Sequence, residues 1–559
     1  MIHQRVRATL VACCAVALLW CNTAANELQA QEKKKPQTKA QPFLVVSVAS
    51  FERLMEDADF MFASAGRPEL SEMIGGALSN VRDLKGLNRD SSAGLLLFLD
   101  GLTPVPIGFV PVKDIDEMMK TIAVGPVTTN KIEEGLYEIR GPSQSLFAKI
   151  SGGYAFVART QENLERDLSD PAEYTRRLAA SYDIAVSANL RAIPKSSREL
   201  LLDFLRASTE ASLQQRDDEP DSVYRIRKAA GMVNLENTEM FLSQAEEATL
   251  GFNVSSTDKS AFLELVITAD PKSEYAKVLN ELGTSRSRFT PLLKNSAPLT
   301  ASAALMVDKN GRKFLKELMA VAEKELIGQL DKEVSKDTTK VSPISELFKS
   351  VQTSVAEGKL DFAAQFVGDT SGPFTFAGGV RIAESEKFNV GLTEIFERLK
   401  GKSEFESVQT NVVEHRGVML HRLQGKGVPE NANRLFGKDH GLYIGSGNGI
   451  LWFAIGAENG LPALKSMIDT VTDAPADDNP VMPAQFMMHV SSWLSLMQRP
   501  DGTVNPIVEL MRESFAAGGG TIRADIKPIQ DGVQIRLNAD EGFVRLIGKA
   551  IGKRIDQRR

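Results

Sequence analysis

The segment Phe43-Leu44-Val45-Val46-Ser47-Val48 is short, apolar and rich in β-branched residues, which is typical of a buried strand. Segments of the same kind recur three more times, beginning at Asp183, Leu299 and Gln485. Each is followed by helical sequence, a paired-strand segment and an amphipathic helix. Such a unit leaves an apolar face that a neighbouring unit must cover, so the recurrence indicates one repeated architecture.

The second part of each unit contains two apolar runs joined by turn-forming residues. In the third unit the runs are 362–367 and 374–382, and Asp369-Thr-Ser-Gly372 joins them as a β-hairpin requires. Helical sequence follows at 386–399. Hairpins followed by single helices predict mainly antiparallel sheets with helices packed on one face, which is an α+β fold.

The odd units carry an insertion that the even units lack. In the third unit it comprises apolar runs at 418–423, 441–444 and 450–455, followed by a helix that ends at Ile468. The order long, short, long, short predicts a tandem duplication, although chance agreement among short strand–helix patterns is the alternative. The predicted first half is 43–295, with a long unit 43–180 and a short unit 181–295, and the second half is 296–559, with a long unit 296–470 and a short unit 484–559.

The amino terminus predicts export. Arg5 and Arg7 precede an apolar run over 8–20, and small or polar residues follow it. This pattern is typical of a secretory signal peptide, cleaved near Ala30 or alternatively after Ala25. The apolar run is shorter than the roughly 20 residues that cross a bilayer, which disfavours an uncleaved anchor. We therefore expect a periplasmic or extracellular protein with no transmembrane span after cleavage.

Removal of the predicted signal peptide, residues 1–30, restricts the chemistry of the mature chain. All three cysteines, Cys13, Cys14 and Cys21, lie within it, so the mature chain is expected to contain none. Thiol catalysis, thiolate metal sites and disulfides are excluded on this expectation. The polar residues 31–42 predict a flexible lead-in. The formal net charge of −6, dispersed along the chain, disfavours nucleic-acid binding.

A group of histidines in the third unit is a weak candidate metal site. His415 and His421 would lie on one face of a single strand, because they are six positions apart, and Glu414 is beside the first. However, Gly417 lies between the histidines, and no HExxH or comparable helical spacing is present. Ordinary surface or strand histidines are the favoured interpretation, so the sequence predicts no metal and no other cofactor.

Other patterns with possible chemistry have simpler interpretations. The glycine-rich run 445–449 would need a helix directly after it to bind phosphate, but the strand-like run 450–455 follows and predicts a hairpin turn. Asp473, Asp477 and Asp478 lack the spacing of a calcium loop and predict a solvated linker. The absence of a GxSxG elbow disfavours a serine hydrolase.

An apolar cluster surrounds the fourth opening strand; its members are Met487, Met488, Trp493, Leu494, Leu496 and Met497. Methionine-rich surfaces adapt to varied partners or lipids, whereas burial in the core is the usual role of such residues. A curved antiparallel sheet covered by helices can also enclose an apolar ligand. The sequence does not distinguish a filled interior from a hollow one.

Over nearly the whole mature chain, this pattern resembles large exported bacterial proteins of unknown function, built from repeated strand–hairpin–helix units that open with segments like Leu299-Thr-Ala-Ser-Ala-Ala-Leu-Met-Val307. The resemblance implies an envelope or extracellular setting and brings no catalytic residues. We expect a non-enzymatic binding or scaffolding protein of the cell envelope, with an envelope protein or a lipid as its partner. The alternatives are a carrier of a lipid or other apolar ligand in a sheet–helix cavity and, third, a hydrolase with an unrecognised site.

Overall fold

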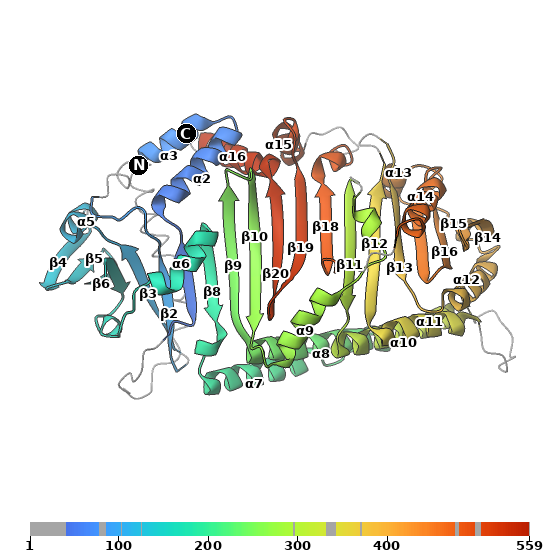
Figure 1. Ribbon diagram of the computed structural model, residues 1–559, viewed down its shortest axis with the longest axis horizontal. Helices are drawn as coiled ribbons and strands as arrows, with labels where there is room; N and C mark the ends of the chain where they lie inside the picture. The colour runs from blue at the N-terminus through green and yellow to red at the C-terminus, as the bar shows by residue number, and fades with distance from the viewer. Residues whose placement is uncertain are drawn as a thin grey trace. The chain divides into compact units, whose positions relative to one another are not determined.

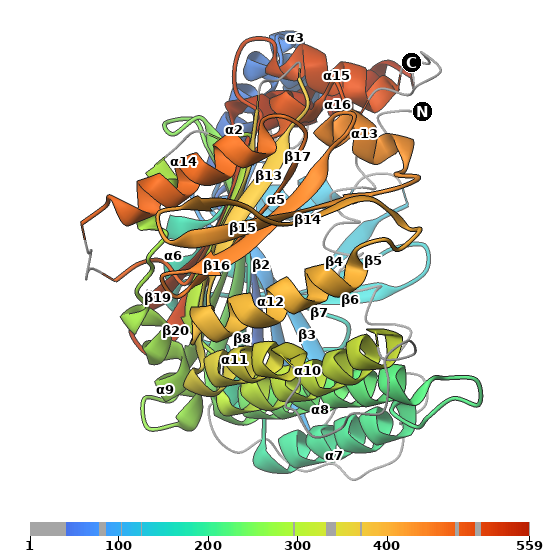
Figure 2. The same cartoon turned by 90° about the vertical axis from the view of Figure 1, so that its right-hand side faces the viewer.

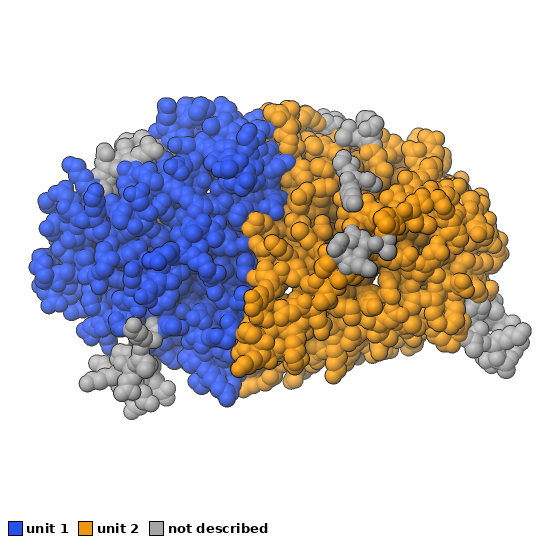
Figure 3. All heavy atoms as spheres, in the orientation of Figure 1, with its two compact units in different colours: residues 1–200, 245–268, 538–559 blue, residues 201–244, 269–537 orange. Residues whose placement is uncertain are grey.

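The computed structural model describes residues 41–77, 85–101, 103–123, 126–294, 297–330, 343–368, 372–475, 480–497 and 505–557. The predicted signal peptide, the three cysteines, Asp477 and Asp478 lie outside the described residues. The chain divides into two compact units, coloured separately in Figure 3: unit 1 comprises 1–200, 245–268 and 538–559, and unit 2 comprises 201–244 and 269–537. Helices and antiparallel strands occur in both, so the predicted α+β fold is confirmed.

Unit 1 contains an antiparallel sheet with the strand order β10-β9-β8-β1-β2-β3-β7-β6-β5-β4 (Figure 1). The strands are β1 (Leu44–Val48), β2 (Ala93–Asp100), β3 (Thr103–Pro111), β4 (Thr128–Glu133), β5 (Leu136–Arg140), β6 (Ser145–Ser151), β7 (Tyr154–Ala158), β8 (Ile184–Asn189), β9 (Ala245–Ser255) and β10 (Ser260–Ala269), of which all but Ala269 belong to this unit. Each strand runs antiparallel to its neighbours, as hairpin connections require.

The helices of unit 1 are α2 (Phe51–Ser64), α3 (Pro68–Ala77), α5 (Ile115–Ile122), α6 (Ala172–Ser181) and α16 (Glu541–Asp556). The C-terminal helix α16 packs against α2, and Arg545 donates a hydrogen bond of 3.2 Å to the carbonyl oxygen of Ser64. A Cβ atom at Gly548 would lie 2.7 Å from the carbonyl oxygen of Met61, so the glycine permits this close crossing.

Unit 2 contains an antiparallel sheet with the strand order β20-β19-β18-β11-β12-β13-β17-β16-β15-β14. The strands are β11 (Leu299–Met306), β12 (Lys359–Val367), β13 (Thr375–Arg381), β14 (Phe405–His415), β15 (Val418–Gly425), β16 (Gly441–Gly447), β17 (Ile450–Gly456), β18 (Ala484–His489), β19 (Thr521–Ile529) and β20 (Gly532–Asp540), whose last residues belong to unit 1. This order corresponds, strand for strand, to the order in unit 1.

The compact units differ from the predicted halves 43–295 and 296–559 in their helices. Helices α8 (Asp221–Gln244) and α9 (Glu274–Glu281) precede residue 296 but belong to unit 2, whereas α16 belongs to unit 1. The predicted duplication concerns the origin of the sequence and not its contacts, so it stays a prediction.

The remaining helices of unit 2 are α7 (Lys195–Ser212, which enters the unit at Leu201), α10 (Lys309–Leu330), α11 (Pro343–Glu357), α12 (Ser385–Leu399), α13 (Glu430–Phe436), α14 (Gly460–Thr472) and α15 (Pro506–Phe515). An ion pair of 2.8 Å between Arg225 and Glu317 joins α8 to α10. Within the described residues, we find no helix with the length and apolar character needed to cross a membrane.

Two helices cover opposite faces of the strands in unit 2 (Figure 2). Helix α14 packs with Tyr443 and Trp452, whereas α12 packs with Ile444 and Leu451. Successive side chains of a strand point to opposite faces, so these neighbouring residues place the helices on different sides. The fully buried Trp452 and the buried helix residues form a core on the α14 side.

The two faces of the unit 1 sheet are covered to different extents: α6 packs on one face at β1 and β8, whereas α5 packs on the other face at β5, β6 and β7. Helix α6 covers the face that carries Val45 and Ala185. Residues that alternate along the strands with those of the face covered by α6 point to the other face. Four large apolar side chains are 37–45% exposed there: Ile184, Leu250, Phe252 and Leu263. We call these four residues the open apolar face. A contiguous apolar surface of this kind is uncommon on a protein that has no partner for it.

Candidate binding site

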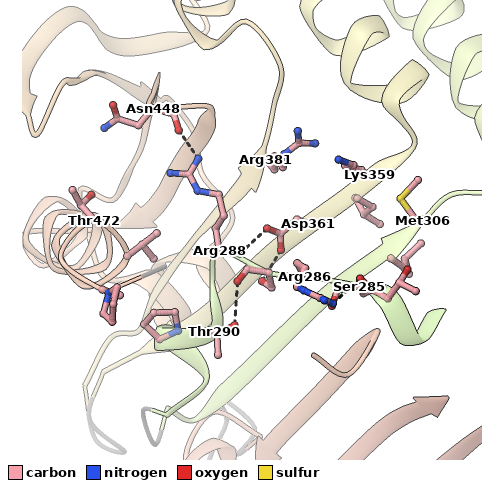
Figure 4. Close-up of a pocket in the computed structure, with 18 residues that line it drawn as sticks. Ser285, Arg286, Arg288, Thr290, Met306, Lys359, Asp361, Arg381, Asn448 and Thr472 are labelled. Atoms are coloured by element: carbon pink, nitrogen blue, oxygen red, sulfur yellow. Dashed lines mark hydrogen bonds between the residues drawn. The ribbon is translucent and has the colours of Figure 1, made fainter. Parts of the chain in front are cut away.

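Unit 2 contains a pocket with a volume of about 760 Å³ at one end of its central strands (Figure 4). Its floor and walls come from the segment 284–291, the ends of β11, β12 and β13, the turn at Asn448, and residues 471–475 at the end of α14. This volume lies in the range of small-molecule sites. All residues that line the pocket belong to unit 2.

A buried carboxyl group holds the segment 284–291 in place. Asp361 is 4% exposed and accepts hydrogen bonds from the Ser287 hydroxyl at 2.6 Å and from the backbone N–H of Arg288 at 2.9 Å. Below it, Phe289 is fully buried and meets Trp452 edge-to-face at a centroid distance of 5.9 Å. These contacts fix the loop whose exposed side chains face the pocket.

Four cationic side chains line the pocket: Arg286, Arg288, Lys359 and Arg381. Arg288 donates to the carbonyl oxygen of Asn448 at 2.6 Å, and Arg381 pairs with Glu357 at 2.8 Å. Arg286 donates to the carbonyl oxygen of Thr284 at 2.9 Å. Lys359 is exposed and has no side-chain partner among the described residues.

The lining contains one carboxyl group, that of Asp361, against these four cations. Burial raises the pKa of Asp361 above the ordinary aspartate value, although hydrogen bonds from Ser287 and from the Arg288 backbone, and the charges of Arg381 and Arg288, act in the opposite direction. The four cationic side chains of the lining therefore outnumber its single carboxyl group.

A second polar group in the lining is buried and unsatisfied. Ser285 is 6% exposed, and its hydroxyl oxygen has no hydrogen-bond partner, although its carbonyl oxygen accepts from the backbone N–H of Val481 at 3.1 Å. A buried hydroxyl without a partner costs free energy, and such groups are rare in folded proteins. A ligand oxygen in the pocket would satisfy it.

Part of the lining is apolar; it includes Pro291, Leu305, Met306, Leu360, Val471 and Pro475. Figure 4 shows Met306 on one side of the pocket and Thr472 on the other, with Arg288 and Asp361 between them. Apolar walls combined with a few polar anchors are typical of sites for organic ligands, because the walls bury the body of the ligand while the anchors orient it.

The end of α14, which forms one wall, is held by the turn between β14 and β15. His415 Nε2 lies 2.8 Å from Oδ1 of Asp469, and Arg416 donates to the same atom at 3.1 Å. Arg416 also pairs with Asp473 at 3.2 Å. We call these contacts of His415 and Arg416 with α14 the clasp. The side-chain amide of Asn448 donates to the carbonyl oxygen of Arg416 at 2.9 Å, which connects the clasp to the pocket rim.

The candidate metal residues Glu414, His415 and His421 are not brought together. The chain turns at Arg416 and Gly417, where φ is 51° and 76°, so the two histidines lie on different strands of a hairpin. His415 pairs with Val418 and faces α14, whereas His421 points to the opposite face and is fully buried against α12. The expectation of one strand with both histidines on one face is therefore wrong.

Burial lowers the pKa of His421, although the charge of Glu397 opposes this effect. Its ring lies 5.1 Å from that of Phe396. Glu414 is exposed. No group of three or more potential metal ligands occurs among the described residues.

Other residues singled out in the sequence have structural roles. Within the run 445–449, residues 445–447 end strand β16, and Asn448 and Gly449 form the predicted hairpin turn, with φ of 56° and 75°. Asp473 belongs to the clasp on α14. Trp493, from the predicted apolar cluster, stacks on Phe374 at a centroid distance of 4.8 Å.

Sequence reasoning did not identify the pocket residues. The strongest available signal was the run Ser285-Arg-Ser-Arg288, which places two cations and two hydroxyls in four positions. Lys359 and Arg381 lie more than seventy residues after that run. The pairing of β12 with β13 brings Lys359 and Arg381 close to each other. The chain matches no protein-family model, no curated protein and no solved structure.

Proposed function

We propose that the protein is a non-enzymatic binding protein that holds a small anionic molecule in the pocket of unit 2. The observation that carries this proposal is the charge of the lining, in which four cations face one buried carboxyl group. Charges of one sign in a concave site attract ligands of the opposite sign and raise their association rate. The expected export to the cell envelope is part of the same proposal and rests on the amino-terminal sequence.

Binding fits the pocket better than catalysis does. The lining includes no histidine and no cysteine. The Ser287 hydroxyl donates a hydrogen bond to Asp361, and its oxygen accepts one from the backbone N–H of Phe289 at 3.0 Å, so it is engaged as a structural group. An activated nucleophile needs a base that is itself oriented by a third group, and this arrangement does not supply one.

Isothermal titration calorimetry with benzoate, phenyl phosphate and neutral phenol tests the proposal. We expect both anions to bind more tightly than phenol, and more weakly as the salt concentration rises, because charge attraction is screened. The Lys359→Glu substitution should weaken both anions about fivefold to tenfold, because it reverses a charge in the pocket.

Lys438→Glu is the matched control. Lys438 is an exposed lysine of unit 2 outside the pocket and has no side-chain partner among the described residues. This variant carries the same change in net charge and should bind both anions as the parent protein does. Binding of phenol as tight as that of the anions, or equal losses in the two variants, would refute the proposal.

A second candidate function is the carriage of an apolar ligand, and the open apolar face of unit 1 favours it. Ile184 pairs with Phe252 across β8 and β9, so their side chains form a continuous apolar row. A ligand would lie on this sheet face and not inside a closed cavity. Four exposed apolar side chains on one sheet face favour an apolar partner.

The uncharged dye N-phenyl-1-naphthylamine tests this second candidate, because its fluorescence increases when it leaves water. Phe252→Ser should lower the dye signal severalfold. Val390→Ser is the control, since Val390 is an apolar residue of α12 that is 59% exposed and lies outside the open apolar face. An equal signal in all three proteins would exclude apolar binding at this face.

A further inference from the structure

We propose that the pocket of unit 2 recognises a phosphate monoester, that is, an organic molecule that carries a terminal phosphate group. This inference rests on the proposed function, because it names the chemical class of the anion that the pocket binds. Three features of the pocket support it: the number of cations that converge, the hydrogen-bond donors that remain free, and the apolar walls beside them.

The positive charge of the pocket exceeds the single negative charge that a carboxylate ligand would bring. Arg288 and Arg381 both lie close enough to Asp361 to affect its ionisation, and Lys359 is on the same strand two positions away. Figure 4 shows Lys359 and Arg381 at the same rim of the pocket. A carboxylate brings one negative charge, whereas a phosphate monoester brings about 1.5 to 2 at neutral pH. The dianion therefore compensates more of the charge.

The free donors match the oxygens of a phosphate group. Lys359 offers an ammonium group without a partner, and Ser285 offers a buried hydroxyl without a partner. Arg381 and Arg288 each use one nitrogen in the contacts to Glu357 and Asn448, and a guanidinium has five N–H donors in all. A phosphate has three terminal oxygens that accept from several directions, whereas a carboxylate has two in one plane.

The remainder of the lining indicates what the phosphate is attached to. The side chains of Leu305, Met306 and Leu360 supply apolar surface, while Thr290 and Thr472 supply hydroxyls. A free phosphate ion would leave most of the 760 Å³ volume without contacts. An organic body attached to the phosphate would fill it, so we expect the ester to bind more tightly than inorganic phosphate.

Competition among matched ligands tests the inference. Phenyl phosphate, phenyl sulfate, benzoate and phenol share one ring and differ in the group attached to it. We expect phenyl phosphate to bind at least about tenfold more tightly than benzoate, with phenyl sulfate between them because it is tetrahedral but carries a single charge. The affinity for phenyl phosphate should rise with pH through about 6, where the second proton leaves.

Two conservative variants identify the side chains that bind the phosphate group. Lys359→Gln and Ser285→Ala should each weaken phenyl phosphate about threefold to tenfold and change benzoate less. Lys438→Gln is the control for the lysine. Ser285→Ala removes an unpaired oxygen from the buried chain, so a loss of binding in this variant cannot be ascribed to misfolding if its thermal unfolding is unimpaired.

The phosphate could belong to a soluble metabolite or to a lipid headgroup, and the two sources are distinguished by sedimentation. If the protein pellets with phosphatidylcholine vesicles only when they contain phosphatidic acid, and Lys359→Gln abolishes this, the source is a lipid. Binding of phenyl phosphate without such pelleting supports a soluble ligand. Benzoate binding as tight as that of phenyl phosphate would overturn the phosphate assignment and leave the proposed function standing, whereas failure of every anion would refute both.

Discussion

Ser287 donates a hydrogen bond of 2.6 Å from its hydroxyl group to Asp361, a residue that is 4% exposed. This contact joins the loop that carries Arg286 and Arg288 to the end of strand β12. The same carboxyl group is the one acid in a pocket lined by four cations. Its position links the stability of the loop to the electrostatics of the site.

The Asp361→Asn substitution should strengthen anion binding severalfold near neutral pH, because it removes the negative charge that repels the ligand. It should also remove a pH dependence of stability. Since the pKa of Asp361 is raised by burial from its ordinary value of 3.8, the native protein holds a proton that the unfolded chain has lost, and stability falls as pH rises through this window.

Urea unfolding at a series of pH values, together with calorimetric titration of benzoate, measures both effects. Glu357→Gln is an informative comparison, because Glu357 pairs with Arg381 but does not line the pocket. If Asp361→Asn leaves anion affinity unchanged, the carboxyl group does not face the bound ligand.

The Ser285→Ala and Ser287→Ala substitutions should have opposite effects on stability. Ser285 has a buried hydroxyl without a partner, so its removal should stabilise the protein by up to about 1 kcal/mol. Ser287 holds Asp361, so its removal should destabilise the protein by about 1–2 kcal/mol. Urea unfolding of the two variants side by side provides the measurement. Equal destabilisation by both would show that the Ser285 hydroxyl has an internal partner.

The carboxyl group of Asp57 in unit 1 should make stability depend on pH near neutrality. Asp183 is 2% exposed and pairs with Arg53 at 2.8 Å. Burial, followed by the charge of Asp183 and a hydrogen bond with it, raises the pKa of Asp57 from 3.8 to about 7. The native state therefore retains a proton between these values that the unfolded state lacks, so stability should fall as pH rises towards 7.

The expected loss between about pH 5 and pH 8 is about 2 kcal/mol, which is less than the full shift implies because the group is only partly buried. Asp57→Asn should abolish this loss, as measured by urea unfolding at the two pH values. Glu56→Gln changes an exposed carboxylate on the same helix, whose charge is the last of the causes that raise the pKa of Asp57, and should retain most of the loss. An unchanged pH profile in Asp57→Asn would locate the titrating group elsewhere.

Asp469→Ala should weaken ligand binding without altering any residue that lines the pocket. The substitution removes the acceptor shared by His415 and Arg416, so residues 471–475 at the pocket wall should become more mobile. Alanine favours the helix, so α14 itself should persist. We expect faster amide hydrogen exchange at 471–475 and about threefold weaker binding of phenyl phosphate. Ser466→Ala, on the exposed side of the same helix, should change neither quantity.

The sequence predicted most strands but missed the last strand of each order. The strand predicted at 43–48 corresponds to β1, and the helix predicted at 386–399 corresponds to α12. Strands β4 and β14, the last strands in the two orders, were not predicted. Neither strand has a buried residue, so both lack the apolar alternation that identifies a strand with one buried face.

The candidate site was beyond prediction for a related reason. Charged residues are common on every protein surface, and Arg288, Lys359 and Arg381 have no spacing that marks them as a group. By contrast, the glycine run 445–449 was predicted correctly as a turn, because the conformation of a turn depends on its own few residues. Only the weak alternative of a metal site placed His415 and His421 on one strand, and that placement is wrong because the chain turns at Gly417 between them.

The sequence by itself determined the α+β class, the antiparallel pairing within hairpins and the positions of most helices, because apolar periodicity and turn chemistry are local properties. The tertiary structure alone decided which strands became neighbours, and thereby which charges met. Arg288, more than seventy residues before Asp361, donates its backbone N–H to this carboxyl group because β12 runs beside the segment 284–291. A binding site assembled from such distant segments depends on long-range packing, which no local pattern encodes.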